Sequence, residues 1–437
     1  MLQRKLGLVH SVAIIVGTVI GSGVFINLPI VARNAGSPLL ATLAWLIGGL
    51  IWIPQVFIIT EMATAYPGQG FGYLYLKKAD KPALAFLYVW SAFITSDTPS
   101  ISIIAMSAVS ALAVFWAPFD ALIFNRLFAV LLILVLTIPH YRDVKTGGNL
   151  QIFLTAIKIS PLLLLIILGV IFCQCHHFTA NETLNTMNLS AFGAVGAGVA
   201  ATVWPYAGIP NLLYMAGEIK NPSKTLPLAL IGSVLAIITA YVLISLATFA
   251  IVPYEELVSF VGSFANPFLY LPFFAAFAAA FLGIFAFISM LGATNACIMV
   301  QPRMEYAIAR DGLFFKPFAH VHPKYNTPDY SIMIQSGLAA ILVIVGGLEA
   351  LLGYFTLSYV LQNTLVYFSI FWLRRKKEYN PSFTSPAWRL MALLSICFQL
   401  GLIYMTFLAF PTGGVLSALA LILTGLPLYS YLKKSAK

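Results

Sequence analysis

Residues 17–25 read GTVIGSGVF. This stretch lies at the centre of a run that carries no charged residue from Leu6 to Ala32, longer than the about 20 apolar residues that one membrane-spanning helix needs. Each glycine inside a helix costs about 1 kcal/mol. Broken backbone at membrane depth persists only where it is buried in protein or lines a wet cavity. We therefore predict a transmembrane helix at residues 8–32 that is interrupted near its midpoint.

A second interruption reads VWPYAGIPN, at residues 203–211, within another apolar run at residues 191–216. Proline costs about 3 kcal/mol in a helix interior and removes a backbone hydrogen bond. Interrupted helices at corresponding places in two halves of a chain indicate a transporter's binding site. The two runs are the first and the sixth, so an odd number of helices separates them and the second half is predicted to be inverted. Ordinary packing glycines and prolines are the alternative, which the sequence leaves open.

The composition predicts an integral membrane protein with about twelve spans. Of the 437 residues, 60% are hydrophobic and only 9% are charged, whereas soluble domains contain roughly 25% charged residues. Backbone inside a bilayer has to be hydrogen-bonded within its own segment, so the spans are expected to be helices. The predicted spans are residues 8–32, 41–64, 83–113, 124–140, 150–172, 191–216, 226–251, 268–299, 329–347, 350–373, 388–409 and 413–432.

The lysines and arginines predict the orientation. If the N-terminus is cytoplasmic, the inside loops hold 21 of the 24 basic residues, and the outside loops hold only Arg33 and Arg126. The positive-inside rule then predicts that both termini are cytoplasmic. The net charge of +10 lies in short clusters between apolar runs and not on one continuous face, so it does not indicate nucleic-acid binding.

The two interruptions offer main-chain groups to a small zwitterion. A half-helix that begins near Gly23 presents free N–H groups and the positive end of its dipole, which suit a carboxylate. Unwound carbonyls around residues 204–207 suit an ammonium group. Together they predict an amino acid site that needs no charged side chain.

Charged residues also fall inside the predicted spans. Lys158 lies ~12 Å along the fifth span, where it either snorkels to the cytoplasmic surface or serves as an internal cation. Asp97, in the third span, is either a functional carboxylate or one that local hydroxyls satisfy beside a proline kink. The sequence leaves both pairs of alternatives open. We expect Glu61 and Glu218, near cytoplasmic helix ends, to be partly solvated.

No motif indicates an enzyme, a cofactor or a metal centre. The sequence contains no Walker A, GxSxG, HExxH or CxxC motif, so transport would be driven by gradients or exchange and not directly by ATP. The segment CQCHH, at residues 173–177, has no second ligand cluster to complete a tetrahedral site, and we do not expect it to bind a metal. The mixture of basic and apolar residues at 302–318 predicts an amphipathic helix at the inner membrane surface.

Four stretches resemble the L-amino acid transporter (LAT) family of the amino acid–polyamine–organocation (APC) superfamily: VGTVIGSGVF (16–25), PGQGFGYLYLKKA (67–79), GEIKNPSKTLPLA (217–229) and PRMEYAIARDGLFFKPFAHVHPKYNTP (302–328). The likeness is greatest to bacterial members that exchange alanine, serine and cysteine. It implies an all-α inverted repeat of five plus five helices, at residues 1–172 and 173–373, with two additional helices at residues 374–437. It also implies sodium-independent exchange of L-amino acids across the bacterial inner membrane.

Position by position, the resemblance places the substrate carboxylate at the backbone of Ser22 and Gly23. It places the amino group at the carbonyls of Val19, Trp204 and Ala207. The predicted substrate-binding residues are Val19, Ile20, Gly21, Ser22, Gly23, Trp204, Pro205, Tyr206, Ala207 and Gly208.

The resemblance also assigns roles to residues around this site. It places Lys158 where sodium-coupled relatives hold an ion, between carbonyls of the first helix and the region of Ser289 in the eighth, with Tyr241 in the same network. The family often has phenylalanine where Trp204 stands, so we expect a smaller cavity and small neutral substrates such as alanine, serine and cysteine. The alternative is a proton-coupled symporter in which Asp97 or Lys158 titrates.

One further implication concerns partners. Animal members of the family join a heavy chain through an external cysteine between the third and fourth spans. The matching loop here, at about residues 114–123, contains no cysteine. We therefore expect no covalently linked heavy subunit.

Overall fold

The structure is a computed structural model that describes residues 2–21, 23–178, 190–261, 265–346, 348–409 and 411–435. Its regular elements within these residues are helices, accompanied by two isolated β-bridges. The α-helices are α1 (Leu8–Val19), α2 (Gly23–Ala35), α3 (Pro38–Leu50), α4 (Trp52–Ala65), α5 (Gly72–Lys78), α6 (Pro82–Ser91), α7 (Thr98–Ser110), α8 (Leu122–Arg142), α9 (Val144–Ile171), α10 (Ala191–Tyr206), α11 (Pro222–Ile251), α12 (Tyr254–Ser259), α13 (Ala278–Val300), α14 (Pro302–Arg310), α15 (Asp329–Val345), α16 (Leu348–Leu373), α17 (Trp388–Ala409) and α18 (Pro411–Ser435).

These helices are long and apolar enough for a multi-pass membrane protein. Seven helical stretches of the described residues can cross a membrane, and the bent pair α1–α2 makes an eighth. Shorter apolar helices follow at 329–345, 360–373 and 388–404. Large apolar side chains also face outward, with Phe192 91% exposed and Ile123 79% exposed, as lipid-facing residues would be. The all-helical class is confirmed, and the count of twelve spans stays a prediction.

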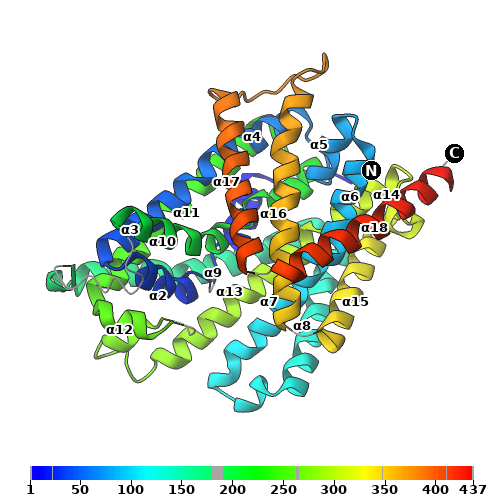
Figure 1. Cartoon of the computed structure of the whole chain (residues 1–437). Helices are drawn as coiled ribbons and strands as arrows, with labels where there is room; N and C mark the ends of the chain where they lie inside the picture. The colour runs from blue at the N-terminus through cyan, green and yellow to red at the C-terminus, as the bar shows by residue number, and fades with distance from the viewer. Residues whose placement is uncertain are drawn as a thin grey trace.

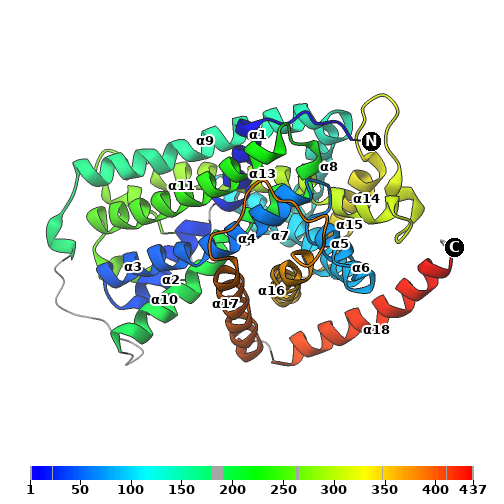
Figure 2. The ribbon, with the colours of Figure 1, turned by 90° about the horizontal axis from the view of Figure 1, so that it is seen from above.

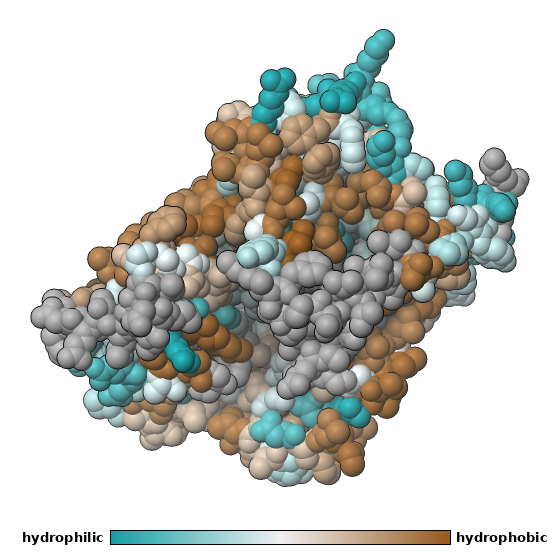
Figure 3. Space-filling view, viewed as in Figure 1, coloured by the Kyte–Doolittle hydropathy of each residue, from teal (hydrophilic) through white to brown (hydrophobic). Residues whose placement is uncertain are grey.

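Apolar side chains cover much of the coloured surface, and polar ones gather at the loop that joins α16 and α17 (Figure 3).

Helices that are distant in sequence pack against one another. In Figure 1, α10 lies beside α2 and α3, and contacts between these elements agree. Figure 2 shows α16, α17 and α18 along one flank of the molecule. Helix α1 contacts α9, α11 and α13, so the first break lies inside the bundle.

Two predicted spans differ from the observed helices. The span predicted at 268–299 is α-helical only from Ala278, because Pro267 and Pro272 precede it in a stretch of 3₁₀ and turn structure. The span predicted at 83–113 contains a π-helical turn, η1 (Ala92–Asp97), just before Pro99. A proline inside a helix cannot donate its hydrogen bond and crowds the preceding turn, and a wider turn relieves that conflict.

The first interruption falls where the sequence predicts it. Helix α1 ends at Val19, and Ile20 is extended, with φ −74° and ψ 106°. Helix α2 starts at Gly23, and the two helices are bent by 50° relative to each other.

The second interruption uses a left-handed glycine. Helix α10 ends at Tyr206 and Ala207 is extended. Gly208 has φ +105°, a conformation that L side chains rarely adopt. The 3₁₀ helix η5 (Ile209–Tyr214) then continues the chain.

The prediction that Glu61 and Glu218 are partly solvated was wrong, because both are buried. Arginines from distant segments reach them. Arg374 donates two hydrogen bonds of 2.7 Å to the Glu61 carboxylate, and Arg303 donates to Glu218 at 2.9 Å. Tyr379 also donates to Glu61, and burial together with that carboxylate raises the pKa of Tyr379.

The stretch 302–318 is not an amphipathic surface helix. It divides into α14 and a short 3₁₀ turn, η8 (Lys316–Ala319). Most of α14 is buried, including Arg303, Glu305 and Tyr306. The charged residues Arg303 and Glu305 are inside the protein, and Arg310 and Lys316, which follow them, are exposed.

Candidate functional site

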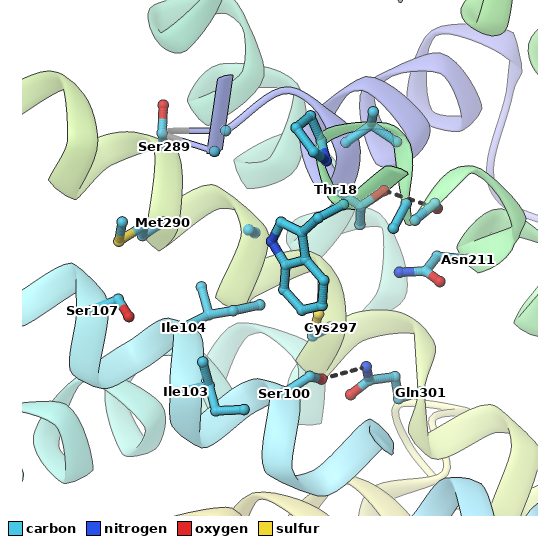
Figure 4. A pocket seen from close by; sticks show the side chains of 18 of the residues that line it. Thr18, Ser100, Ile103, Ile104, Ser107, Asn211, Ser289, Met290, Cys297 and Gln301 are labelled. Atoms are coloured by element: carbon cyan, nitrogen blue, oxygen red, sulfur yellow. Dashed lines mark hydrogen bonds between the residues drawn. The ribbon is translucent and has the colours of Figure 1, made fainter. Parts of the chain in front are cut away.

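A cavity of about 320 Å³ lies between the two broken helices. Helices α7 and α13 complete its wall, and Figure 4 shows their side chains around it. The lining residues are Thr18, Val19, Gly21, Gly23, Ile26, Asp97, Ser100, Ile103, Ile104, Ser107, Trp204, Pro205, Ala207, Gly208, Asn211, Tyr214, Ser289, Met290, Ala293, Cys297 and Gln301.

The wall formed by the first break contains small residues at the start of α2. Gly21 and Gly23 both line the cavity. A Cβ built on Gly23 would meet only the Trp204 ring, at 3.9 Å. The first N–H groups of a helix have no partner within the helix, so the start of α2 offers donors and a partial positive charge. Ser22, which the prediction includes, lies outside the described residues.

The wall formed by the second break is tied to the first by two hydroxyl groups. The Tyr241 hydroxyl lies 3.1 Å from the Val19 carbonyl and 3.0 Å from the Pro205 carbonyl. The Thr18 hydroxyl lies 3.2 Å from the Gly208 carbonyl. Tyr241 therefore bridges the two breaks, outside the cavity lining.

Two residues of the predicted set point elsewhere. Ile20 and Tyr206 are buried and are not part of the cavity lining. The Tyr206 hydroxyl donates to the Trp45 carbonyl at 2.9 Å. Its ring packs against Trp45 and Tyr241, with centroid distances of 6.2 and 5.0 Å. We conclude that Tyr206 stabilises the second break through contacts on the side that faces away from the cavity.

Lys158 is fully buried, so the snorkelling alternative was wrong. Its ammonium donates a hydrogen bond to the Gly17 carbonyl on α1, three residues before the break. On α13 it lies against Gly292, where an added Cβ would be 3.6 Å from the Lys158 nitrogen. The expected contact with Ser289 is not formed, because the Ser289 hydroxyl has no hydrogen-bond partner among the described residues.

Sequence reasoning missed a polar network that surrounds Lys158. Thr155 donates to the Ala13 carbonyl at 3.1 Å, one turn before Gly17. Asn295 on α13 donates to Gln151 on α9 at 2.8 Å, and its oxygen lies 2.9 Å from His140 on α8. The i, i+4, i+7 spacing of Gln151, Thr155 and Lys158 on one helix face was the available signal.

Polar side chains also line the cavity where α7 faces the end of α13, and the sequence did not predict that they lie together. Asp97, left open by the sequence, lines the cavity, and so does Gln301. Gln301 donates to the Ser100 hydroxyl at 2.9 Å, the contact dashed in Figure 4. No spacing in the sequence connects α7 with the end of α13, so only the fold reveals this grouping.

No group of three or more potential metal ligands occurs among the described residues. In the segment 173–177, the sulfur atoms of Cys173 and Cys175 are 3.7 Å apart. His177 is turned to the Phe249 carbonyl, at 3.3 Å.

Comparison with known proteins decides the family. Residues 6–427 match the family model described as amino acid permease. The chain belongs to this family. It is 28% identical over 443 residues to the serine/threonine exchanger SteT of Bacillus subtilis, covering 99% of this chain and 98% of that protein.

Two animal relatives extend the likeness. The b(0,+)-type amino acid transporter 1 of Oryctolagus cuniculus is 27% identical over 366 residues, covering 82% of this chain and 73% of that protein. The Asc-type amino acid transporter 1 of Mus musculus is 25% identical over 446 residues, covering 98% and 81%. The predicted membership of the APC superfamily, with LAT-type relatives, is thereby confirmed. This permease is a multi-pass membrane protein and an amino acid transporter, not an enzyme.

Proposed function

We propose that this permease exchanges small neutral L-amino acids, such as alanine, serine and cysteine, without sodium and by alternating access. The observation that carries the proposal is a cavity that residues of both helix breaks line. Binding at the junction of two broken helices allows one half of a transporter to rock against the other around a fixed site. The printed names of relatives add support, since one is a serine/threonine exchanger.

The backbone recognises both ends of the substrate in this proposal. The carboxylate accepts hydrogen bonds from N–H groups at residues 21–23, where α2 begins. The ammonium group donates to carbonyls of Val19, Trp204 and Ala207. The Val19 carbonyl already accepts from Tyr241, but a carbonyl oxygen has two lone pairs and can take a second donor.

Lys158 supports the sodium-independent part of the proposal. A buried cation is costly unless it is hydrogen-bonded, and its bond to the Gly17 carbonyl holds it against the first broken helix. A fixed positive charge beside these carbonyls takes the place of a bound metal cation. Transport then needs no ion from solution.

The preference for small substrates rests on Trp204. Its indole lines the cavity beside Gly23 and is 44% exposed. A large side chain at this position leaves less room for the substrate side chain. We therefore assign selectivity by size to Trp204.

The topology belongs to the same proposal. Helices α15 to α18 overlap the last four predicted spans, which supports the count of twelve spans. Two inverted repeats, at 1–172 and 173–373, and cytoplasmic termini complete the proposed topology. We further propose that the protein resides in the bacterial inner membrane and works without a covalently linked heavy subunit.

Uptake of radiolabelled alanine into proteoliposomes in sodium-free buffer tests the function. We expect uptake only into vesicles preloaded with alanine, serine or cysteine, and no stimulation by sodium. Stronger competition by leucine or phenylalanine than by serine would contradict the assigned size class. A requirement for sodium would contradict the role of Lys158.

A proton-coupled symporter of the same fold is the second candidate, because the Asp97 carboxyl lines the cavity. Such a symporter accumulates alanine in empty vesicles when the outside is acidic. An exchanger does not, because it requires internal substrate. The same vesicles therefore separate the two mechanisms.

A further inference from the structure

A second acidic residue lies close to Asp97 at the end of the cavity. Asp97 ends the π-helical turn η1, and Glu305 lies on α14, four residues beyond Gln301. The Gln301 side chain contacts Ser100, three residues beyond Asp97, which brings the start of α14 to the same end of the cavity. Asp97 is only 5% exposed and Glu305 is fully buried. We refer to these two residues as the acidic pair.

If both residues of the acidic pair are ionised, their carboxylate oxygens have too few hydrogen-bond donors. The Asp97 Oδ1 atom is 3.4 Å from the Tyr214 hydroxyl and 3.5 Å from the Ser96 hydroxyl, longer than ordinary O–H···O bonds. Glu305 Oε1 is 3.4 Å from the Gln335 amide nitrogen. The other oxygens, Asp97 Oδ2 and Glu305 Oε2, have no hydrogen-bond partner within the described part of the chain.

The surroundings of the acidic pair offer further acceptors. The Ser100 hydroxyl donates to the Asp97 main-chain carbonyl, so it accepts from the Gln301 amide nitrogen. That contact fixes the amide orientation and leaves Gln301 Oε1 without a partner. Gln335 Oε1 is likewise unpartnered in the described structure. Buried acceptors without donors cost free energy, and a proton on either carboxyl turns an acceptor into a donor.

The neighbouring cations are occupied elsewhere. Arg303 donates through Nε to Glu218 and through Nη1 to the Met299 carbonyl, and its Nη2 has no hydrogen-bond partner among the described residues. Lys158 donates to the Gly17 carbonyl. No ion pair among the described residues includes Asp97 or Glu305. Two negative charges buried without a cation are strongly unfavourable, so at least one carboxyl has to be neutral.

The groups that face the acidic pair come from several elements. From α16, Gln362 accepts from Ser96 at 3.3 Å and donates to Ser91 on α6 at 3.0 Å. The ionisable and charged groups nearest the pair are Tyr214 on η5, Cys297 on α13 and Arg303 on α14. His140 on α8 and Lys158 on α9 are directed to other partners, Asn295 and the Gly17 carbonyl.

We propose that Asp97 and Glu305 form a proton-binding site whose occupancy is linked to that of the amino acid site. Asp97 shares the cavity with the two helix breaks, and its donor Tyr214 ends the 3₁₀ helix that follows the second break. A substrate that fills the cavity expels water from Asp97. Loss of water disfavours a charged carboxylate, so substrate binding favours the protonated pair. Reciprocally, protonation strengthens substrate binding. This linkage rests on the proposed amino acid site.

Infrared spectroscopy of the purified, ligand-free protein tests the proton site without substrate. We expect a carbonyl stretching band of a buried protonated carboxyl in the wild type, lost when both acids are replaced in the double variant Asp97→Asn, Glu305→Gln. The matched control is Glu256→Gln, which changes an exposed acid and should retain the band. Absence of the band in the wild type at neutral pH would overturn the proposal.

Calorimetry of alanine binding in buffers of different ionisation enthalpy tests the linkage. We expect wild-type protein to take up protons on binding, with affinity falling by up to about tenfold per pH unit as pH rises, the limit for one linked proton. The double variant Asp97→Asn, Glu305→Gln should abolish this pH dependence, and Glu256→Gln should keep it. Binding heats that do not depend on buffer would overturn the linkage. Complete absence of alanine binding, with the infrared band present, would instead contradict the proposed amino acid site.

Discussion

The two helix breaks have different local structures, and the proposed function gives them complementary tasks. At the first break an α-helix restarts at Gly23, so main-chain donors face the cavity. At the second, α10 ends and a left-handed Gly208 leads into a 3₁₀ helix, so main-chain acceptors precede the turn. A charged side chain, Lys158, holds the first break, whereas hydroxyl and ring contacts hold the second. Two breaks of this kind can therefore present opposite polarities to one zwitterion.

The largest effect is expected at the first break. Lys158→Ala removes a buried, charge-assisted hydrogen bond to the Gly17 carbonyl, a kind of bond worth roughly 1.5–3 kcal/mol. We expect sodium-free alanine exchange to fall by about 10- to 100-fold, with partial recovery in sodium. Lys145→Ala, at an exposed lysine on the same helix, is the control. Unchanged exchange in Lys158→Ala would remove the distinction between the two breaks.

At the second break, Gly208→Ala should have the next largest effect. An L side chain at φ +105° is strained by roughly 1–2 kcal/mol, and its Cβ would lie 3.3 Å from Thr18. We expect exchange to fall by about tenfold. Gly232→Ala, where a Cβ meets nothing within 4 Å, should behave as wild type. Equal activity of the two variants would show that the left-handed turn is dispensable.

Trp204→Phe tests which side chain limits substrate size. A smaller ring enlarges the cavity beside Gly23, and one or two methylene groups in a pocket change discrimination by about tenfold. We expect leucine to compete about tenfold better against alanine. Trp116→Phe, at a tryptophan with the same 44% exposure outside the cavity, serves as the control. A selectivity ratio that stays constant would assign the size limit to another residue.

The smallest effect is expected where the breaks meet. Tyr241→Phe removes the hydroxyl that lies between the Val19 and Pro205 carbonyls, and a neutral hydrogen bond contributes about 1 kcal/mol. Alanine affinity should weaken by about fivefold, as equilibrium binding can measure. Tyr404→Phe, at a tyrosine 63% exposed, should leave it unchanged. An effect as large as that of Lys158→Ala would mean that the breaks are not separate units.

The sequence predicted both breaks within a few residues, because glycine and proline disrupt helices through local backbone chemistry. It could not show that Tyr206 faces Trp45 while Tyr241 faces the breaks, since helix rotation depends on packing between distant segments. For the same reason it misjudged Glu61 and Glu218, whose arginine partners lie 313 and 85 residues away in the chain.

Lys158 and Asp97 illustrate how far the sequence reaches. Both were candidate functional residues because each carries a charge inside an apolar run, and the fold places them in different surroundings. Lys158 is committed to a carbonyl of α1, and Asp97 opens on the cavity with an unpartnered oxygen among the described atoms. Only tertiary structure brought Glu305, from a stretch expected at the membrane surface, close to Asp97.

A structure of the permease with alanine bound, determined by cryo-electron microscopy, tests the central claim most directly. We predict that the substrate carboxylate lies against the N–H groups of residues 21–23, and that its ammonium group contacts carbonyls of residues 19, 204 and 207. Density for alanine against Lys158 or Asp97, away from both breaks, would contradict recognition by the main chain.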